Sequence, residues 1–229
     1  MKRLVLALVA VLFVSPAAHA ETYAEGMAAF SQRQYQAAIM IWTPLAEGGH
    51  VSAMFNLGRM YDHGIGVVED NVVAVAWYQQ AAERNFAPAM VHYGLALIEG
   101  VHVEENWTLA VACIQRAAEG GDPDAQFEMG KIYRDGVVLA RDYVESVRWY
   151  RAAAEQGHTR AQYRMGFMYG SGYGVPQDFV QAYYFYGLAA ERMTISASAQ
   201  LQLTEYMSID EISTAEALLN GTPNFASNE

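Results

Sequence analysis

The side chains that usually carry chemistry are scattered through this 229-residue chain and form no recognised catalytic or metal-binding spacing. Its histidines stand singly, without the His-x-His or His-Glu-x-x-His spacing that directs two imidazoles at one metal ion. Acidic pairs such as Glu69-Asp70 and Glu104-Glu105 precede expected helices, where capping and the helix dipole explain them. General acid–base catalysis would need such a group in a dry pocket, which nothing in the sequence predicts. We therefore predict no catalytic residue, no metal site and no cofactor.

One glycine-rich segment, residues 170–174 (Gly-Ser-Gly-Tyr-Gly), has the composition of a phosphate-binding loop. Such a loop follows a strand and ends in Gly-Lys-Ser or Gly-Lys-Thr, and this segment has neither feature. It also stands where residues 64–66 (Gly-Ile-Gly) stand in an earlier repeat. We therefore interpret both segments as turns between helices.

The single cysteine, Cys113, excludes an intrachain disulfide. Trp77, Trp149 and Phe185 hold the equivalent position elsewhere, which favours a buried apolar side chain over a reactive or intermolecular thiol. The net charge of −11, without a stretch that clusters Lys and Arg, predicts no nucleic-acid partner. The same charge favours solubility and attracts basic partners.

The first 20 residues have the pattern of a signal peptide. Lys2 and Arg3 precede an apolar run over residues 4–14, and Ala-His-Ala at 18–20 resembles a cleavage site. The run is too short to span a bilayer, so we predict no stable membrane insertion. We expect a mature chain that starts at Glu21, in the periplasm or outside the cell.

The dominant feature of the sequence is a 36-residue period. A fixed period of this length indicates one helical unit stacked repeatedly on its neighbours, since no single unit buries its apolar face alone. Two of the recurring columns are Gly58, Gly94, Gly130, Gly166 and Ala53, Ala89, Ala125, Ala161.

Each unit reads as two helices. Apolar residues at helical spacing predict a first helix over 51–63, in which Gly58 would allow close approach of a second helix at Ala81 and Ala82. Asp70 and its equivalents are expected to cap the second helix, and the Asn85 column is expected to end it. No segment alternates with period two, so we predict no strands.

This pattern resembles the Sel-one-like (Sel1-like) repeat family, a relative of tetratricopeptide repeats with a longer loop between its helices. The resemblance implies an all-α fold, an α-solenoid of helix-turn-helix repeats in a right-handed superhelix, with four repeats over residues 51–192. Val138 and His102 replace the second loop glycine and Leu97 replaces a tyrosine, which affects loop conformation. The pattern is carried by Ala53, Leu57, Gly58, Tyr61, Gly64, Gly66, Val67, Asp70, Ala74, Trp77, Tyr78, Ala81 and Ala82.

The two ends fit a capped array. Residues 21–50 resemble a degenerate tetratricopeptide-like repeat whose loop is four residues shorter. Residues 193–221 are expected to form capping helices, with Ala197 in register with the earlier repeats and a capping box from Ser208 to Glu211. We expect a disordered tail over 222–229.

The first helices supply the candidate binding surface. If the repeats stack as tetratricopeptide repeats do, the side of each first helix opposite its packing face lines the concave surface of the solenoid. A row of aromatic side chains flanked by cations on that surface would bind a partner protein or peptide with acidic groups. The alternative, favoured for Phe55 and Phe127, is that the aromatic column packs between neighbouring first helices. The candidate residues are Phe55, Arg59, Asp62, Val91, Leu95, Phe127, Lys131, Arg134, Tyr163 and Phe167.

The resemblance implies a non-enzymatic scaffold in the bacterial envelope. One alternative is a secreted virulence or host-interaction factor that uses the same surface. Another is β-lactam binding or hydrolysis, credited to cysteine-rich members of the family, but their disulfides have no counterpart in a chain with one cysteine. Oligomeric state is left open.

Overall fold

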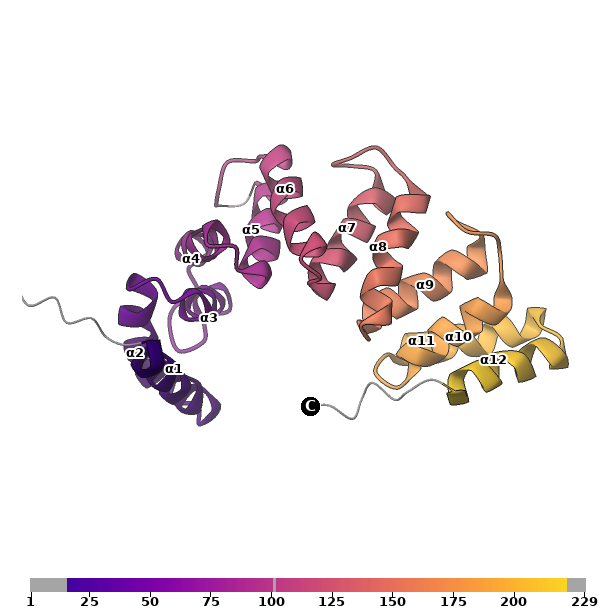
Figure 1. Ribbon diagram of the computed structural model, residues 1–229, viewed down its shortest axis with the longest axis horizontal. Coiled ribbons are helices and arrows are strands. Elements are labelled where there is room, and N and C mark those ends of the chain that lie inside the picture. Colours follow the sequence, from indigo (N-terminus) through magenta and orange to yellow (C-terminus); the bar gives the residue numbers. More distant parts are fainter. Residues whose placement is uncertain (1–15, 101, 222–229) are drawn as a thin grey trace, which may run out of the picture. The chain divides into compact units, whose positions relative to one another are not determined.

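The computed structural model describes residues 16–100 and 102–221, apart from the side chains of 16–21, and these residues form helices and loops without any strand (Figure 1). Residues 1–15 of the expected signal peptide and the expected disordered tail at 222–229 lie outside this description. The α-helices are α1 Pro16–Ser31, α2 Tyr35–Glu47, α3 Val51–Asp62, α4 Asn71–Glu83, α5 Ala87–Glu99, α6 Trp107–Glu119, α7 Pro123–Asp135, α8 Tyr143–Glu155, α9 Thr159–Ser171, α10 Phe179–Ala190, α11 Thr194–Leu203 and α12 Ile209–Gly221.

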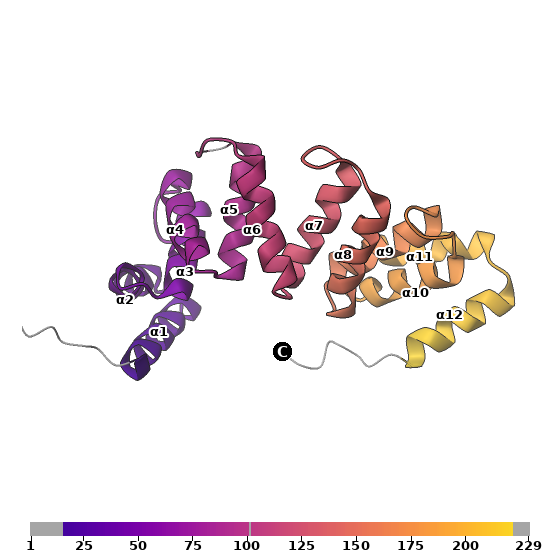
Figure 2. The same ribbon diagram turned by 45° about the horizontal axis from the view of Figure 1, so that its top comes forward.

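The chain divides within α4 into two compact units, residues 1–77 (unit 1) and residues 78–229 (unit 2). In unit 2, three helix pairs follow one another, α5 with α6, α7 with α8 and α9 with α10, and each pair packs on the next (Figures 1 and 2). The predicted all-α solenoid of helix-turn-helix repeats is therefore confirmed. None of the described helices has the length and apolar character needed to cross a membrane.

Within each pair, a glycine of the first helix lies directly against a large side chain of the second. A Cβ atom built on Gly130 would lie 2.5 Å from Cδ1 of Tyr150, and one on Gly166 would lie 2.6 Å from Cδ1 of Tyr186. The backbone also approaches closely, because the buried Ser146 hydroxyl donates to the Gly130 carbonyl at 2.7 Å. These contacts supply the packing reason for glycine inside a helix, where it otherwise costs about 1 kcal/mol relative to alanine.

The paired alanines serve a different contact from the one predicted. We expected Ala81, Ala82 and their equivalents to face the helical glycines, but in unit 2 larger side chains of the second helices lie nearest to those glycines. The carbonyls of one alanine column instead accept hydrogen bonds from the next repeat. Gln126 of α7 donates to the carbonyl of Ala118 at 3.2 Å, and Gln162 of α9 donates to that of Ala154 at 3.3 Å. Alanine there lets the next first helix approach the backbone of the preceding second helix.

The second helices are capped as predicted. In the third repeat, Asp142 Oδ1 accepts from the backbone N–H groups of Val144 and Glu145 at 2.9 and 3.0 Å. Asp70, Asn106 and Asp178 accept equivalent bonds. The capping residue also closes the loop through its own N–H, which donates to a carbonyl near the end of the first helix, as from Asp142 to Tyr133 at 2.9 Å.

The loops depend on left-handed residues that contact the preceding repeat. A Cβ on Gly174 would clash with the backbone carbonyl of Tyr143, so glycine is needed at this position for space as well as for its φ of +70°. His102 takes the equivalent position with a φ of +60°, and the N–H of Asn106 still closes its loop on the Leu97 carbonyl. The substitution therefore leaves the helix pair intact.

The N-terminal pair repeats the glycine contact with a shorter loop. In α1, Gly26 lies against the indole of Trp42 in α2, so closely that a Cβ atom would clash with the ring. Residues 32–34 join the two helices. Residues 16–20, assigned to the signal peptide, form the first part of α1.

At the C-terminal end, the expected register is wrong by one residue. Ser196, rather than Ala197, is buried, and its hydroxyl donates to the Tyr186 carbonyl at 2.8 Å. The reason is that Met193 stands where earlier repeats have a left-handed glycine or asparagine. In addition, α10 ends at Ala190, one residue earlier than the equivalent second helices, before a turn of the same length. The predicted capping box is confirmed, since Ser208 and Glu211 exchange backbone and side-chain hydrogen bonds.

Two glycines of α9 allow a matched test of the helix-pair contact. Gly166→Ala should lower the free energy of unfolding by about 1–3 kcal/mol, because the added methyl overlaps the buried Tyr186 ring. Gly170→Ala should be neutral or stabilise by about 0.5–1 kcal/mol, because its nearest neighbour would be 3.7 Å away. Chemical denaturation of both variants checks this, and equal effects would contradict it.

Candidate functional site

The candidate residues of unit 1 lie on α3. Arg59 is exposed, while Phe55 and Asp62 are half-buried. Asp62 lies 3.8 Å from Nδ1 of the exposed His63. Arg59 is therefore the most accessible of the three.

Two candidates of the aromatic column are core residues. Val91 is 6% exposed and Phe127 is 5% exposed, so neither is available to a partner. The Phe127 ring stacks on His158 at 4.8 Å between centroids, and the guanidinium of Arg160 lies 4.7 Å from its centre. Because His158 and Arg160 belong to the next repeat, the favoured alternative is confirmed for Phe127, which packs between successive first helices.

The remaining candidates of unit 2 lie on the accessible side of α5, α7 and α9, which we call the inner face. Lys131 pairs with Glu128 at 2.8 Å, and Arg134 pairs with Asp135 at 2.7 Å. Both cations are therefore already matched by carboxylates. The inner face comprises Leu95, Lys131, Arg134, Tyr163, Arg164 and Phe167.

Aromatic side chains occupy the α9 part of the inner face. The Tyr163 ring lies 5.4 Å from the Tyr186 ring, and Phe167, which is 37% exposed, lies 5.9 Å from the Tyr173 ring. Phe167 is therefore the large apolar side chain of this surface that is most accessible to a partner.

Two further residues of this region did not enter the sequence-based surface. Arg164 is half-buried, and its guanidinium lies 5.7 Å from the centre of the Tyr163 ring. In the part of the chain that the structure describes, no carboxylate lies within ion-pair distance of it. Tyr150 is completely buried, and its hydroxyl has no hydrogen-bond partner among the described residues.

Tyr150 was not predicted as a binding residue because it lies in the apolar packing stripe of a second helix. One sequence feature could have indicated it. In the third and fourth repeats a tyrosine of the second helix recurs together with a glycine of the first helix, and glycine leaves room for a long side chain to extend across that helix. Burial raises the pKa of Tyr150 to about 12, and the charges of Arg134 and Arg164 act in the opposite direction. Both guanidinium groups therefore lie within electrostatic range of this hydroxyl.

The Lys and Arg residues are unevenly distributed along the chain. Half of the 14 Lys and Arg residues fall within residues 131–164, which contain only four acidic residues, so this segment has a formal charge of +3 in a chain of −11. The expected absence of clustering is therefore corrected, although the cations are spread over α7, α8, α9 and one loop and form no continuous run. The seven cations are Lys131, Arg134, Arg141, Arg148, Arg151, Arg160 and Arg164.

His158 links two repeats. Its Nδ1 accepts from the backbone N–H of Ala161 at 3.1 Å and caps α9, so the ring proton resides on Nε2. Nε2 lies 3.0 Å from Asp124 Oδ1 and donates to it. This hydrogen bond lowers the pKa of Asp124 below its ordinary value, and the charge of Arg160 acts in the same direction. His50 caps α3 in the same way, through Ala53.

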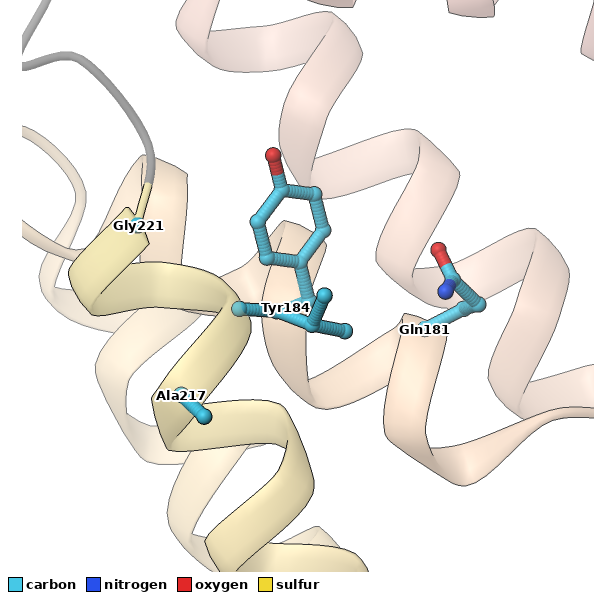
Figure 3. A pocket seen from close by; sticks show the side chains of 5 residues that line it. Gln181, Tyr184, Ala217 and Gly221 are labelled. Atoms are coloured by element: carbon cyan, nitrogen blue, oxygen red, sulfur yellow. The ribbon is translucent and has the colours of Figure 1, made fainter.

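Other possible sites have simple structural explanations. Cys113 is 8% exposed, and burial raises the pKa of its thiol, which confirms its interpretation as a buried side chain. A pocket of about 390 Å³ lies between α10 and α12, where Tyr184 and Gln181 face Ala217 and Gly221 (Figure 3). Its lining contains no ionisable group apart from the Tyr184 phenol. Among the described residues, no three His, Cys, Asp or Glu side chains form a metal-binding group.

The model of the Sel1 repeat matches four consecutive segments of the chain, residues 51–86, 87–122, 123–158 and 159–192. These segments cover more than half of the sequence and coincide with the four repeats inferred from the 36-residue period. No curated protein sequence matches the chain significantly.

Solved structures share the fold. A protective antigen of uropathogenic Escherichia coli, described as displaying an SLR fold, is 27% identical with a TM-score of 0.79 over 88% of this chain, which spans only 44% of the antigen. A Sel1 repeat protein from Oxalobacter formigenes is 29% identical, with a TM-score of 0.72 over 89% of this chain and 86% of that protein. An immunity protein from Pseudomonas aeruginosa is 19% identical, with a TM-score of 0.58 over 94% and 84%, which shows the fold alone.

The lowered pKa of Asp124 predicts how stability responds to acid. Ionised Asp124 contributes stability that is complete above its unfolded pKa, near pH 4, and that is lost as pH falls through the lowered pKa of the folded state. The free energy of unfolding of the wild type should therefore decrease more steeply below pH 4 than that of Asp124→Asn. Denaturant titrations between pH 6 and about pH 2.5 measure this. Glu104→Gln, in an exposed loop, should follow the wild type, and parallel curves for all three proteins would contradict the assignment.

Proposed function

This chain belongs to the Sel1 repeat family, and on that premise we propose that it is a non-enzymatic scaffold that binds a partner protein through the inner face of unit 2. Proteins built from Sel1 repeats are in general protein-interaction scaffolds. The proposal for this chain is narrower, because it assigns the surface and the chemistry of the partner.

The observation that carries the proposal is the combination of accessible aromatic and cationic side chains on α7 and α9. Phe167 is exposed, and Tyr163 and Arg164 are half-buried beside it on the same helix. Aromatic and Arg side chains are the residues most enriched at binding hot spots. The +3 charge of residues 131–164 favours a partner segment with acidic groups.

The perturbed ionisable groups support a scaffold over an enzyme. Asp124 is shifted by the hydrogen bond from His158, which caps a helix. The pKa of Tyr186 is raised to about 12 by burial in the packing contact with Gly166. Perturbed groups in an active site would converge on one cleft, whereas these two hold repeats and helices together.

The proposed location is the bacterial envelope, after export. The cationic and apolar pattern of the first 20 residues supports it, as does the likeness to a protective antigen. The likeness to that antigen also favours the second candidate, a secreted host-interaction factor, which would use the same inner face on a different partner.

An in-cell photocrosslinking experiment tests the surface. A photoreactive phenylalanine analogue replaces Phe167 on the inner face or, as a control, Gln79 on the exposed side of α4. We expect a discrete adduct from position 167 alone, because only there would the reactive ring lie in the interface. The adduct should weaken when Lys131 and Arg134 are replaced by Glu, since acidic groups would then be repelled.

Adducts from position 79 and none from 167 would contradict the inner-face assignment. Cell fractionation separates the two candidates, because an adduct formed in the periplasmic fraction supports the envelope scaffold. An adduct formed only after addition of the culture supernatant to host material supports the secreted factor.

A further inference from the structure

The Tyr150 side chain extends from the second-helix layer toward the inner face. Its ring lies on the backbone of Gly130 in α7, and its centroid is 5.6 Å from that of Phe127 in the same helix. It also belongs to the buried cluster that contains Met165 of α9. The ring therefore lies on α7 in a core that α9 shares, and Arg134 of α7 and Arg164 of α9 both act electrostatically on its hydroxyl.

The Tyr150 hydroxyl lacks a hydrogen-bond partner among the described residues, and it is fully buried. A buried hydroxyl without a partner costs about 1–3 kcal/mol, and replacing it by hydrogen would remove that cost. Tyr186, its equivalent in the next repeat, has no such orphan oxygen.

The charges around this hydroxyl have an excess of one cation when Lys131, the partner of Glu128, is counted with them. Four charged groups act on it electrostatically, Arg134, Arg164, Asp135 and Glu128. Asp135 pairs with Arg134, and Glu128 pairs with Lys131, whereas Arg164 has no carboxylate at ion-pair distance in the described chain. One anionic group would therefore complete the set.

We propose that the inner face between α7 and α9 binds a single carboxylate of a partner protein, held by the Arg164 guanidinium and by a hydrogen bond from the Tyr150 hydroxyl. The inference rests on the proposed function and specifies its chemistry. A guanidinium matches the two oxygens of a carboxylate, and a phenol donates a short, charge-assisted bond to it. Because the Tyr150 hydroxyl is buried in this structure, neighbouring side chains move to admit the carboxylate.

A carboxylate fits better than a phosphate. A phosphate group carries about two negative charges and would leave an unmatched charge beside Glu128 and Asp135, whose carboxylates repel it. A side-chain carboxylate carries one charge, which equals the excess on Arg164. The neighbouring aromatic residues Tyr163 and Phe167 then contact the apolar part of the partner segment.

Fluorescence anisotropy with a labelled tetraglutamate peptide tests the site. We expect saturable binding to the full chain, about tenfold weaker binding by Arg164→Gln and about tenfold weaker binding by Tyr150→Phe, as for the loss of one charge-assisted hydrogen bond. The matched control is Arg148→Gln, which removes the same charge from the exposed side of α8 and should change the affinity less than twofold. Labelled tetraglutamine and a phosphoserine peptide should bind at least tenfold more weakly than tetraglutamate.

Stability separates a binding role from a structural one. Tyr150→Phe should keep or raise the denaturation midpoint, because it removes an unpartnered hydroxyl and retains the ring. Weaker peptide binding together with unchanged or higher stability supports the site. Equal loss of affinity in Arg164→Gln and Arg148→Gln would overturn it in favour of diffuse charge attraction, and tighter binding of the phosphoserine peptide would overturn the carboxylate.

The outcome also distinguishes this site from the proposed function. If tetraglutamate does not bind, or binds unchanged in Tyr150→Phe, the carboxylate site fails. Crosslinking at position 167 would still show that a partner docks on the inner face by other contacts.

Discussion

Close contact between a helical glycine and a large side chain of the paired helix is the constraint on which the rest of this structure depends. In the third and fourth repeats the partner is a tyrosine, and a Cβ atom on the glycine would lie within 2.6 Å of its ring. Nothing larger than hydrogen fits, so the distance between the paired helices is set by ring thickness. The same approach brings Ser146 within hydrogen-bond distance of the glycine carbonyl.

This packing contact also brings a tyrosine hydroxyl close to the inner face. Because the glycine has no side chain, the tyrosine lies across the first helix instead of ending against it, and its hydroxyl approaches the charged side chains of that face. The residue that is deepest in the helix pair thus contributes a polar atom close to the accessible surface. In the second repeat Ile114 holds this position against Gly94 and supplies no hydroxyl, so the third repeat differs chemically from the second on an equivalent backbone.

Contacts between repeats use a different set of residues from those within a repeat. Alanine pairs on the second helices let glutamines of the next first helix reach the backbone, and His158 joins a helix cap to a carboxylate of the preceding repeat. These polar bonds fix the position of α9 relative to α7, which is the spacing that the inner face requires. A solenoid has only such neighbour contacts to define a surface that extends over several repeats.

The sequence by itself determined the repeat, the two helices of each unit, the caps at Asp70, Asn106, Asp142 and Asp178 and the capping box, because these features depend on local spacing and local hydrogen bonds. It also indicated that Phe127 packs in the core. Only the tertiary structure decided which column faces the helical glycine and that α10 ends one residue early. It also decided that Lys131 and Arg134 are already paired, and that Arg164 and the Tyr150 hydroxyl lie within electrostatic range of each other. The physical reason is that these outcomes depend on distances between helices, which a one-dimensional period does not encode.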